Sequence, residues 1–183
     1  MSDIMSVLTP LQLSLLNKRT IEISGYINNE TAQYVYVALL MMKPFGNPDM
    51  EVIINSQGGN ATAGFYIYDL FTNYKGGITG TVAGKAQSIA AIILQACDIR
   101  QCYKHSDLLI HNPSPGEVGW GNFFDENKLE ATRKVLIGVR DKMYAILQEK
   151  TGKSFDEIAE ECARDADMDP QKALKFGLID EIL

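Results

Sequence analysis

The sequence has few of the side chains on which metal and disulfide chemistry depend. It contains two histidines, His105 and His111, so a reaction that needs an imidazole base has only these two candidates. Its three cysteines, Cys97, Cys102 and Cys162, are an odd number and favour reduced thiols over a disulfide framework. Cys97, Cys102 and His105 match no familiar zinc spacing and lack a fourth ligand. We therefore expect no metal site and no structural disulfide.

Long apolar runs and an excess of positive charge are also missing. No stretch reaches the length of apolar residues that spans a bilayer, and the first residues carry no basic region typical of a secretory signal. The formal net charge of −6 argues against a nucleic-acid-binding surface, which needs a basic footprint. The chain has no repeats, linkers or low-complexity tracts, and 183 residues suit one sizeable core. We expect a single cytoplasmic domain over residues 1–183, with neither membrane nor nucleic acid as partner.

Strand and helix patterns alternate through the first part of the chain. Short segments with an apolar or alternating pattern predict strands at residues 19–24, 50–55, 78–83 and 107–111. The segments between them have helical patterns, at residues 28–40, 61–74 and from 88 onward. Repeated strand–helix units of this length are typical of an α/β fold with a mostly parallel sheet and right-handed crossovers.

The last third of the chain is predicted to be mainly helical. A long helix is expected over residues 125–150, because apolar residues recur at three and four positions: Leu129, Leu136, Val139, Met143, Ile146 and Leu147. A helix of about 26 residues is roughly 39 Å long, which is more than this domain needs. Part of it should therefore project and pack against another copy of the chain. Two shorter helices, begun by a Ser154–Glu157 capping box and by Asp169–Pro170, and a short strand at 177–180 follow.

Residues 80–94 form the stretch around which the candidate chemistry is organised. Ser88 lies in the first turn of a predicted helix, where backbone N–H groups lack intrahelical partners. A hydroxyl there can be a nucleophile, because the N–H of Ile89 can stabilise negative charge on an attacked carbonyl. The alternative is that Ser88 merely caps a buried helix, and this stretch alone favours the cap.

Segments far from Ser88 in the sequence are predicted to lie beside it, which supports a catalytic role for this residue. In open parallel sheets, sites gather at the carboxyl ends of the strands. Residues 55–59 end one predicted strand, residues 84–88 end the next, and His111 ends another. Within the first of these, Gly58 and Gly59 have two interpretations. They either form a tight turn with positive φ or present N–H groups to an oxyanion.

Serine hydrolysis needs a hydroxyl, a neutral imidazole and a carboxylate that orients the imidazole. Ser88 and His111 supply the first two. The candidates for the third lie close together near the C-terminus: Asp156, Glu157, Glu160, Glu161, Asp165, Asp167 and Asp169. Spacing alone does not choose between them.

Over nearly its whole length the chain resembles the Clp protease proteolytic subunit, ClpP. The matching segments occur in the family's order and spacing: residues 54–59 (INSQGG) with 62–64 (TAG), 84–91 (GKAQSIAA), 109–113 (LIHNP), the pair Arg164–Asp165, and 173–180 (ALKFGLID). Each segment is only moderately specific, but their joint order and spacing is hard to obtain by chance.

The resemblance implies a Ser–His–Asp peptidase. It makes Ser88 the nucleophile, His111 the base and Asp165 the orienting acid, with the N–H groups of Gly59 and Ile89 as the oxyanion hole. It further implies an α/β spiral of strand–helix units related to crotonases, with a projecting handle helix. The handle region corresponds to residues 117–150, with Glu117–Asn122 beside the helix.

The resemblance also implies partners and substrates. Subunits of the family assemble as two stacked heptameric rings, and a hexameric AAA+ unfoldase uses ATP to feed them unfolded polypeptides. The chain itself then needs no cofactor. Substrate-binding positions correspond to Gly58, Gly59, Asn112 and Pro113. Arg164 matches a residue that links active-site order to ring assembly in the family.

Two positions beside the site depart from the family pattern. The family usually has Pro where Gln57 stands and Gln where Asn112 stands. Two other functions are compatible with the sequence: a catalytically silent ring subunit that acts as a scaffold in a mixed ring, and a crotonase-like acyl-CoA enzyme. The filled positions at Ser88, His111 and Asp165 argue against the silent subunit, because such relatives usually lack one or more of these residues. Crotonase chemistry normally relies on carboxylates at the site and has no need for a Ser–His pair at these strand ends. His105, just before a predicted strand, is interpreted as a surface loop residue.

Overall fold

A computed structural model describes residues 8–114 and 125–183 of the chain. Its centre is a 6-stranded sheet in which all the strand pairs are parallel. The order is β1-β2-β3-β4-β6, and β5 pairs with the far end of β3. The strands are β1 (Thr20–Ile27), β2 (Met50–Gly59), β3 (Ile78–Gln87), β4 (Ile99–Cys102), β5 (Asp107–Leu109) and β6 (Glu181–Ile182). The α/β class and the parallel sheet predicted from the sequence are confirmed.

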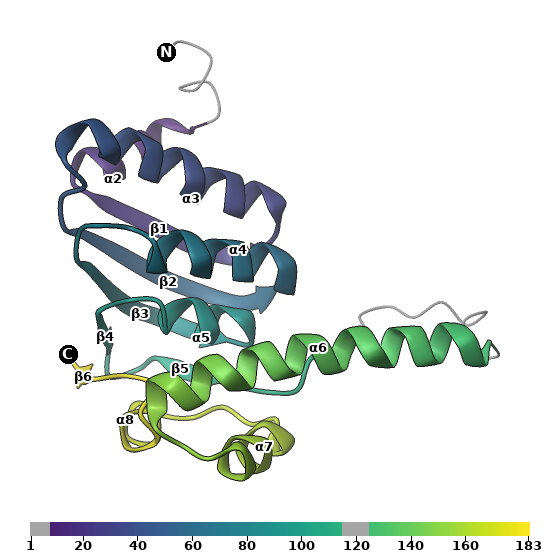
Figure 1. The fold of residues 1–183 in the computed structure, drawn as a ribbon. Coiled ribbons are helices and arrows are strands. Elements are labelled where there is room, and N and C mark those ends of the chain that lie inside the picture. Colours follow the sequence, from purple (N-terminus) through teal and green to yellow (C-terminus); the bar gives the residue numbers. More distant parts are fainter. Residues whose placement is uncertain (1–7, 115–124) are drawn as a thin grey trace.

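Helices cover one face of this sheet. Figure 1 shows α3 (Asn29–Met42), α4 (Ala61–Thr72) and α5 (Ile89–Leu94) stacked along β1, β2 and β3. Alternate strand residues that face these helices, such as Val52 and Ile54 of β2, are completely buried. The short α2 (Pro10–Asn17) packs on β1, and a 3-10 turn at Lys43–Phe45 follows α3. α5 is apolar on every side and is entirely buried, so it lies at the centre of the core.

The first three strands are longer than predicted. We expected them to end at Ser24, Asn55 and Ala83, but each continues for three or more residues toward the candidate site. The pairing register shifts on the way, between Ser24 and Tyr26 in β1 and after Ile54 in β2. Two glycines with positive φ, Gly25 at 71° in β1 and Gly84 at 107° in β3, allow the strands to continue past these irregularities. From the sequence alone, glycines at these positions predict turns.

Three smaller expectations about strands need correction. β4 was not predicted, because its sequence Ile-Arg-Gln-Cys lacks a clear alternating pattern. β5 stops at Leu109 instead of reaching His111. The last strand is Glu181–Ile182, not residues 177–180, because Gly177 adopts φ 94° to end the preceding helix.

The long helix α6 (Glu126–Thr151) has the predicted length, and Figure 1 shows its N-terminal half extending beyond the sheet. Its buried residues are confined to the C-terminal half: Met143, Tyr144 and Leu147. Toward the other end, apolar side chains are exposed, including Val135 at 66%. The part of the handle region at residues 117–122 lies outside the described residues.

Two helices follow α6 and pack beneath it. Ser154 and Glu157 make the predicted capping box at the start of α7 (Phe155–Arg164). Asp169 caps α8 (Pro170–Phe176), with Pro170 at its first position as expected. None of the helices in the described ranges is both long and apolar enough to cross a membrane.

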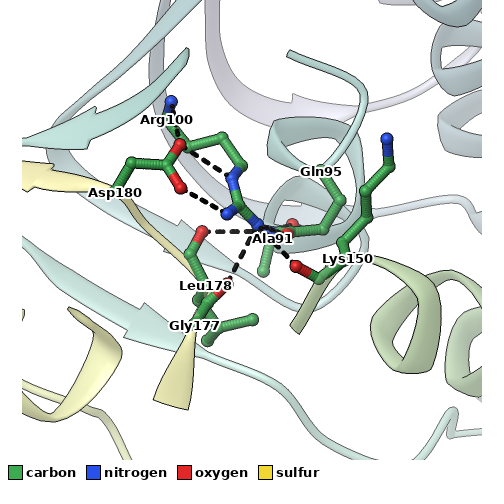
Figure 2. A network of polar contacts seen from close by, with 7 residues as sticks. All are labelled: Ala91, Gln95, Arg100, Lys150, Gly177, Leu178 and Asp180. Atoms are coloured by element: carbon green, nitrogen blue, oxygen red, sulfur yellow. Dashed lines mark hydrogen bonds and ion pairs between the residues drawn. The ribbon is translucent and has the colours of Figure 1, made fainter. Parts of the chain in front are cut away.

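A polar network joins the end of α5 to these C-terminal elements (Figure 2). The Arg100 guanidinium of β4 donates to both carboxylate oxygens of Asp180, to Gln95 Oε1 at 2.6 Å and to the Gly177 carbonyl at 2.9 Å. Gln95, completely buried just after α5, also donates to the Leu178 carbonyl at 3.2 Å. The helix that begins beside Ser88 is thereby fixed to the segment that follows α8.

Candidate active site

Ser88 occupies a strained turn between β3 and α5. Its backbone adopts φ 57° and ψ −128°, a region that residues other than glycine rarely enter. The backbone N–H of Ser88 donates to the Leu109 carbonyl at 2.8 Å, which ties the turn to β5. Among the described residues its side chain makes no capping hydrogen bond. The capping interpretation of Ser88 is therefore wrong, and the hydroxyl is available for another role.

The Ser88 hydroxyl is hydrogen-bonded to His111. His111 Nε2 lies 2.9 Å from Ser88 Oγ, and His111 Nδ1 lies 3.0 Å from Asp165 Oδ1. The pairing of Gln87 with Leu109 explains the first contact, since it sets the turn at Ser88 beside the chain that leaves β5. The three side chains form a continuous hydrogen-bonded chain from hydroxyl to imidazole to carboxylate.

Asp165 comes to His111 from the end of α7. It occupies the left-handed C-cap position of that helix, at φ 46° and ψ 47°, and its side chain is 70% exposed. Two backbone hydrogen bonds between Leu108 and Met168, of 3.0 and 2.7 Å, hold the following segment against β5. Asp165 and His111 are thus both anchored to β5.

The other carboxylates considered from the sequence have different surroundings. Asp156 is exposed in the first turn of α7, and the remaining ones contact other groups: Glu157 with Ser154, Glu160 with Arg164, Glu161 with Lys172 and Arg164, Asp167 with Gln87, and Asp169 with the Lys172 N–H. Of the candidate acids, Asp165 is the one hydrogen-bonded to His111.

Gly58 brings its backbone close to Ser88, and Gly59 brings its backbone close to Ile27 of β1. At Gly58, with φ 94°, a Cβ atom would lie 2.7 Å from both the Gln87 carbonyl oxygen and Ser88 Cβ. At Gly59, a Cβ atom would lie 2.2 Å from the Ile27 carbonyl oxygen. Both positions therefore require glycine for steric reasons. Ile89 is the first residue of α5, where an N–H lacks an intrahelical partner. The assignment of Gly59 and Ile89 to an oxyanion hole stays a prediction.

A groove of about 270 Å³ opens beside Ser88 and His111. Of the four predicted substrate-binding residues, Gly59 and Pro113 line it, whereas Gly58 and Asn112 are not among the lining residues. The side chain of Asn112 instead accepts a hydrogen bond from the Tyr144 hydroxyl at 2.8 Å.

Sequence reasoning missed the apolar wall of this groove. It is formed by one face of α6, with Leu136, Val139 and Met143. Their three- and four-residue spacing was visible in the sequence, but it was interpreted as packing of the long helix. Tyr26, beyond the irregularity in β1, also lines the groove, and no pattern in the sequence pointed to it.

The residues considered for metal binding have other environments. Burial raises the pKa of the Cys97 thiol to about 12, which disfavours the thiolate that binds zinc. Cys102 is also buried, and burial raises the pKa of its thiol. His105 is exposed after β4, as predicted for a surface loop residue. Within residues 8–114 and 125–183, no cluster of His, Cys, Asp and Glu has the arrangement of a metal site.

Comparisons with known proteins agree with this geometry. The model of the Clp protease family matches residues 6–183. Among solved structures, a point mutant of ClpP1 from Listeria monocytogenes is 28% identical in sequence, with a TM-score of 0.81. The match covers 94% of this chain and 95% of that chain. The resemblance to ClpP and the ClpP-like α/β fold are therefore confirmed. Members of this family generally form ring oligomers that work with Clp unfoldases. The chain belongs to the Clp protease family.

Proposed function

We propose that this chain is the proteolytic subunit of an ATP-dependent Clp protease, a serine endopeptidase that hydrolyses unfolded polypeptides. The observation that carries the proposal is the hydrogen-bonded chain from Ser88 Oγ through His111 to Asp165, with distances of 2.9 and 3.0 Å. A nucleophile, a base within hydrogen-bonding reach and a third group that orients the base are the requirements of serine hydrolysis.

Each member of the triad has a distinct role in the proposed reaction. With its proton on Nδ1, the neutral His111 donates to Asp165 and accepts from the Ser88 hydroxyl through Nε2. As Ser88 Oγ attacks the peptide carbonyl, His111 takes the hydroxyl proton and then gives it to the departing amine. The Asp165 carboxylate stabilises the imidazolium that forms in between. A water molecule then hydrolyses the acyl-enzyme by the same route.

Negative charge on the attacked oxygen needs donors that are already in place. We assign this role to the N–H groups of Gly59 and Ile89. The close approach of the neighbouring Gly58 to Ser88 supports this assignment, as do the place of Gly59 in the groove beside Ser88 and the position of Ile89 at the start of a buried helix. The positive end of the α5 dipole would favour an oxyanion at this point.

The groove favours substrates with an apolar side chain next to the cleaved bond. Its volume of about 270 Å³ suits one such side chain, and Ile89, Pro113 and Met143 supply apolar contacts around it. Burial of a leucine-sized side chain would contribute about 1.5–3 kcal/mol to binding. Gly59 also lines the groove.

The proposal includes an assembly of two stacked heptameric rings fed by an AAA+ unfoldase. The exposed apolar residues on the projecting half of α6, including Leu129, Val135 and Ile137, support packing against another copy. Arg164, which adjoins the triad acid and contacts Glu160 and Glu161, would connect that packing to the site. ATP would be used by the unfoldase, and this chain would need no cofactor.

Hydrolysis of fluorogenic peptides by wild type and the Ser88→Ala variant tests the proposal. We expect the assembled wild type to cleave peptides after an apolar residue far faster than after an acidic residue, and Ser88→Ala to cleave neither. Both proteins should have the same native mass, so that the loss reports chemistry. An assembled wild type that cleaves none of these peptides would contradict the proposal and favour a silent ring subunit.

A further inference from the structure

The hydroxyl of Tyr144 makes a buried contact just beyond the triad. Tyr144 lies on α6 with only 2% of its surface exposed, and its hydroxyl donates to Asn112 Oδ1 at 2.8 Å. Asn112 directly follows His111 in the chain and precedes Pro113. The residue before a proline is biased toward extended backbone conformations, which limits the freedom of the chain next to His111.

The same side chain contacts the helix that carries the acid. The Tyr144 ring packs edge-on against Phe155 at the start of α7, with 5.1 Å between ring centroids. The Arg140 guanidinium lies 5.9 Å from the centroids of both rings. α7 ends at Arg164, and Asp165 is its C-cap residue. Tyr144 therefore contacts both the segment of the base and the helix of the acid.

On this basis we propose that Tyr144 is a positioning residue for His111, acting through its hydrogen bond to Asn112. The inference rests on the proposed peptidase function. The hydrogen bond fixes the segment from His111 to Asn112 relative to α6 and α7, so that the imidazole stays aligned between Ser88 and Asp165. The neighbouring Met143 lines the groove, so the same turn of α6 supports both the groove wall and the base.

The hydroxyl keeps its donor role over the working range of pH. Burial, together with the nearby Cys162, raises the pKa of Tyr144 to about 12. The phenol therefore stays protonated at neutral pH and donates to the carbonyl oxygen of the Asn112 amide. Asn at this position, instead of the family's usual Gln, is shorter by one methylene, and the long Tyr144 side chain reaches it.

Tyr144→Phe tests this role, because it removes the hydroxyl and keeps the ring that packs on Phe155. We expect kcat for peptide hydrolysis to fall by about tenfold to a hundredfold, with KM changed less than about twofold, because a small misplacement of a catalytic group is enough for such losses. Asn112→Ala should cause a similar loss. The double variant should be no slower than the slower single variant, since both changes remove one interaction.

Tyr74→Phe is the matched control. It also removes a hydrogen-bonded hydroxyl, which donates to the Pro48 carbonyl at 2.7 Å, at the edge of the sheet away from the site. We expect a comparable loss of thermal stability and a kcat within about twofold of wild type. If Tyr144→Phe kept the wild-type kcat, or if the losses of the two single variants multiplied in the double variant, the proposal would be overturned.

Crystal structures of wild type and Tyr144→Phe provide a readout that does not depend on activity. We expect the variant to lose the hydrogen bond between His111 Nε2 and Ser88 Oγ or to show several His111 orientations. An unchanged imidazole in Tyr144→Phe would overturn the positioning role. If Tyr144→Phe showed this structural response but the wild type hydrolysed no peptide, the proposed function would be contradicted and the positioning role would stay in place.

Discussion

Replacing Arg100 by Met should destabilise the fold much more than it affects the chemistry. The Arg100 side chain is only 11% exposed, and Figure 2 shows its guanidinium at the centre of the network that joins α5 to the C-terminal segment. Met fills most of the same volume but donates no hydrogen bonds. The change therefore leaves the buried Gln95 oxygen and the Gly177 carbonyl without this donor, and Asp180 without its opposite charge.

The magnitude follows from the individual contacts. A hydrogen bond from a charged donor contributes about 1.5–3 kcal/mol, and two of them, to Gln95 and Gly177, lie at the buried end. The Asp180 side chain is 42% exposed, so that ion pair adds at most about 1 kcal/mol. Water that hydrogen-bonds to the groups left without a donor should offset part of this loss of stability. We expect Arg100→Met to lower the free energy of unfolding by about 3 kcal/mol.

Urea unfolding followed by circular dichroism measures this change. Wild type and variant should be compared at one subunit concentration, since assembly makes apparent stability depend on concentration. Arg100→Lys is the control, because the lysine ammonium keeps the positive charge but lacks the planar set of N–H donors of a guanidinium. We expect it to lower the free energy of unfolding by about half as much as Arg100→Met does. A loss below about 1 kcal/mol, or a Lys variant as stable as wild type, would refute the reasoning.

The same change has a predictable dependence on pH. Burial alone would raise the pKa of the Asp180 carboxyl, but the hydrogen bonds and charge of Arg100 outweigh it and hold the pKa below its ordinary value. A group with a lowered folded-state pKa stabilises the fold above its ordinary pKa, and the contribution is lost as the pH falls through the folded-state pKa. The difference between wild type and Arg100→Met should therefore shrink below about pH 4.

Three further substitutions address the site. His111→Ala should lower peptide hydrolysis on the order of 10⁴-fold or more, whereas His105→Ala should keep most of it, and equal losses would contradict the assignment of the base. Asp165→Asn should lower kcat on the order of 10²- to 10⁴-fold, because the neutral amide neither stabilises the imidazolium nor favours the Nδ1–H tautomer of His111; an unchanged kcat would contradict its role. Gly58→Ala places a Cβ atom 2.7 Å from Ser88 Cβ and should cut peptide hydrolysis at least about tenfold. The control is Gly138→Ala on α6, where a Cβ atom meets nothing within 4 Å among the described residues; it should raise the stability in thermal unfolding by about 0.5–1 kcal/mol. Similar effects of the two substitutions would count against the steric argument.

The alternation of strands and helices could be predicted from the sequence, but the course of the strands near the site could not. Hydrophobic periodicity identifies β2, because its buried residues alternate with partly exposed ones up to Ile54. β3 is instead buried without alternation from Gly80 to Val82, as in a strand covered on both faces. Beyond those residues, the path of each strand is determined by its contacts with the adjacent strand. A Cβ atom at Gly84 would lie 2.6 Å from Asn55 Oδ1, a contact between strands that no local pattern contains.

The nucleophile and the base could be proposed from strand ends, whereas the acid and the conformation of Ser88 could not. The candidate carboxylates all lie between residues 156 and 169, and what selects Asp165 is the pairing of Leu108 with Met168. That pairing joins segments 60 residues apart in the chain. The positive φ of Ser88 likewise accompanies a hydrogen bond from its N–H to the Leu109 carbonyl, a contact that its own sequence does not contain. Tertiary contacts therefore determine both which carboxylate meets His111 and which backbone conformation Ser88 adopts.

Covalent labelling of Ser88 tests the central claim most directly. Wild type and Ser88→Ala are incubated with a fluorophosphonate and analysed by intact-mass spectrometry, with a native mass measured on the same samples. The account predicts one adduct per chain on the assembled wild type and none on Ser88→Ala. An assembled wild type without an adduct, or an adduct that persists on Ser88→Ala, would contradict it.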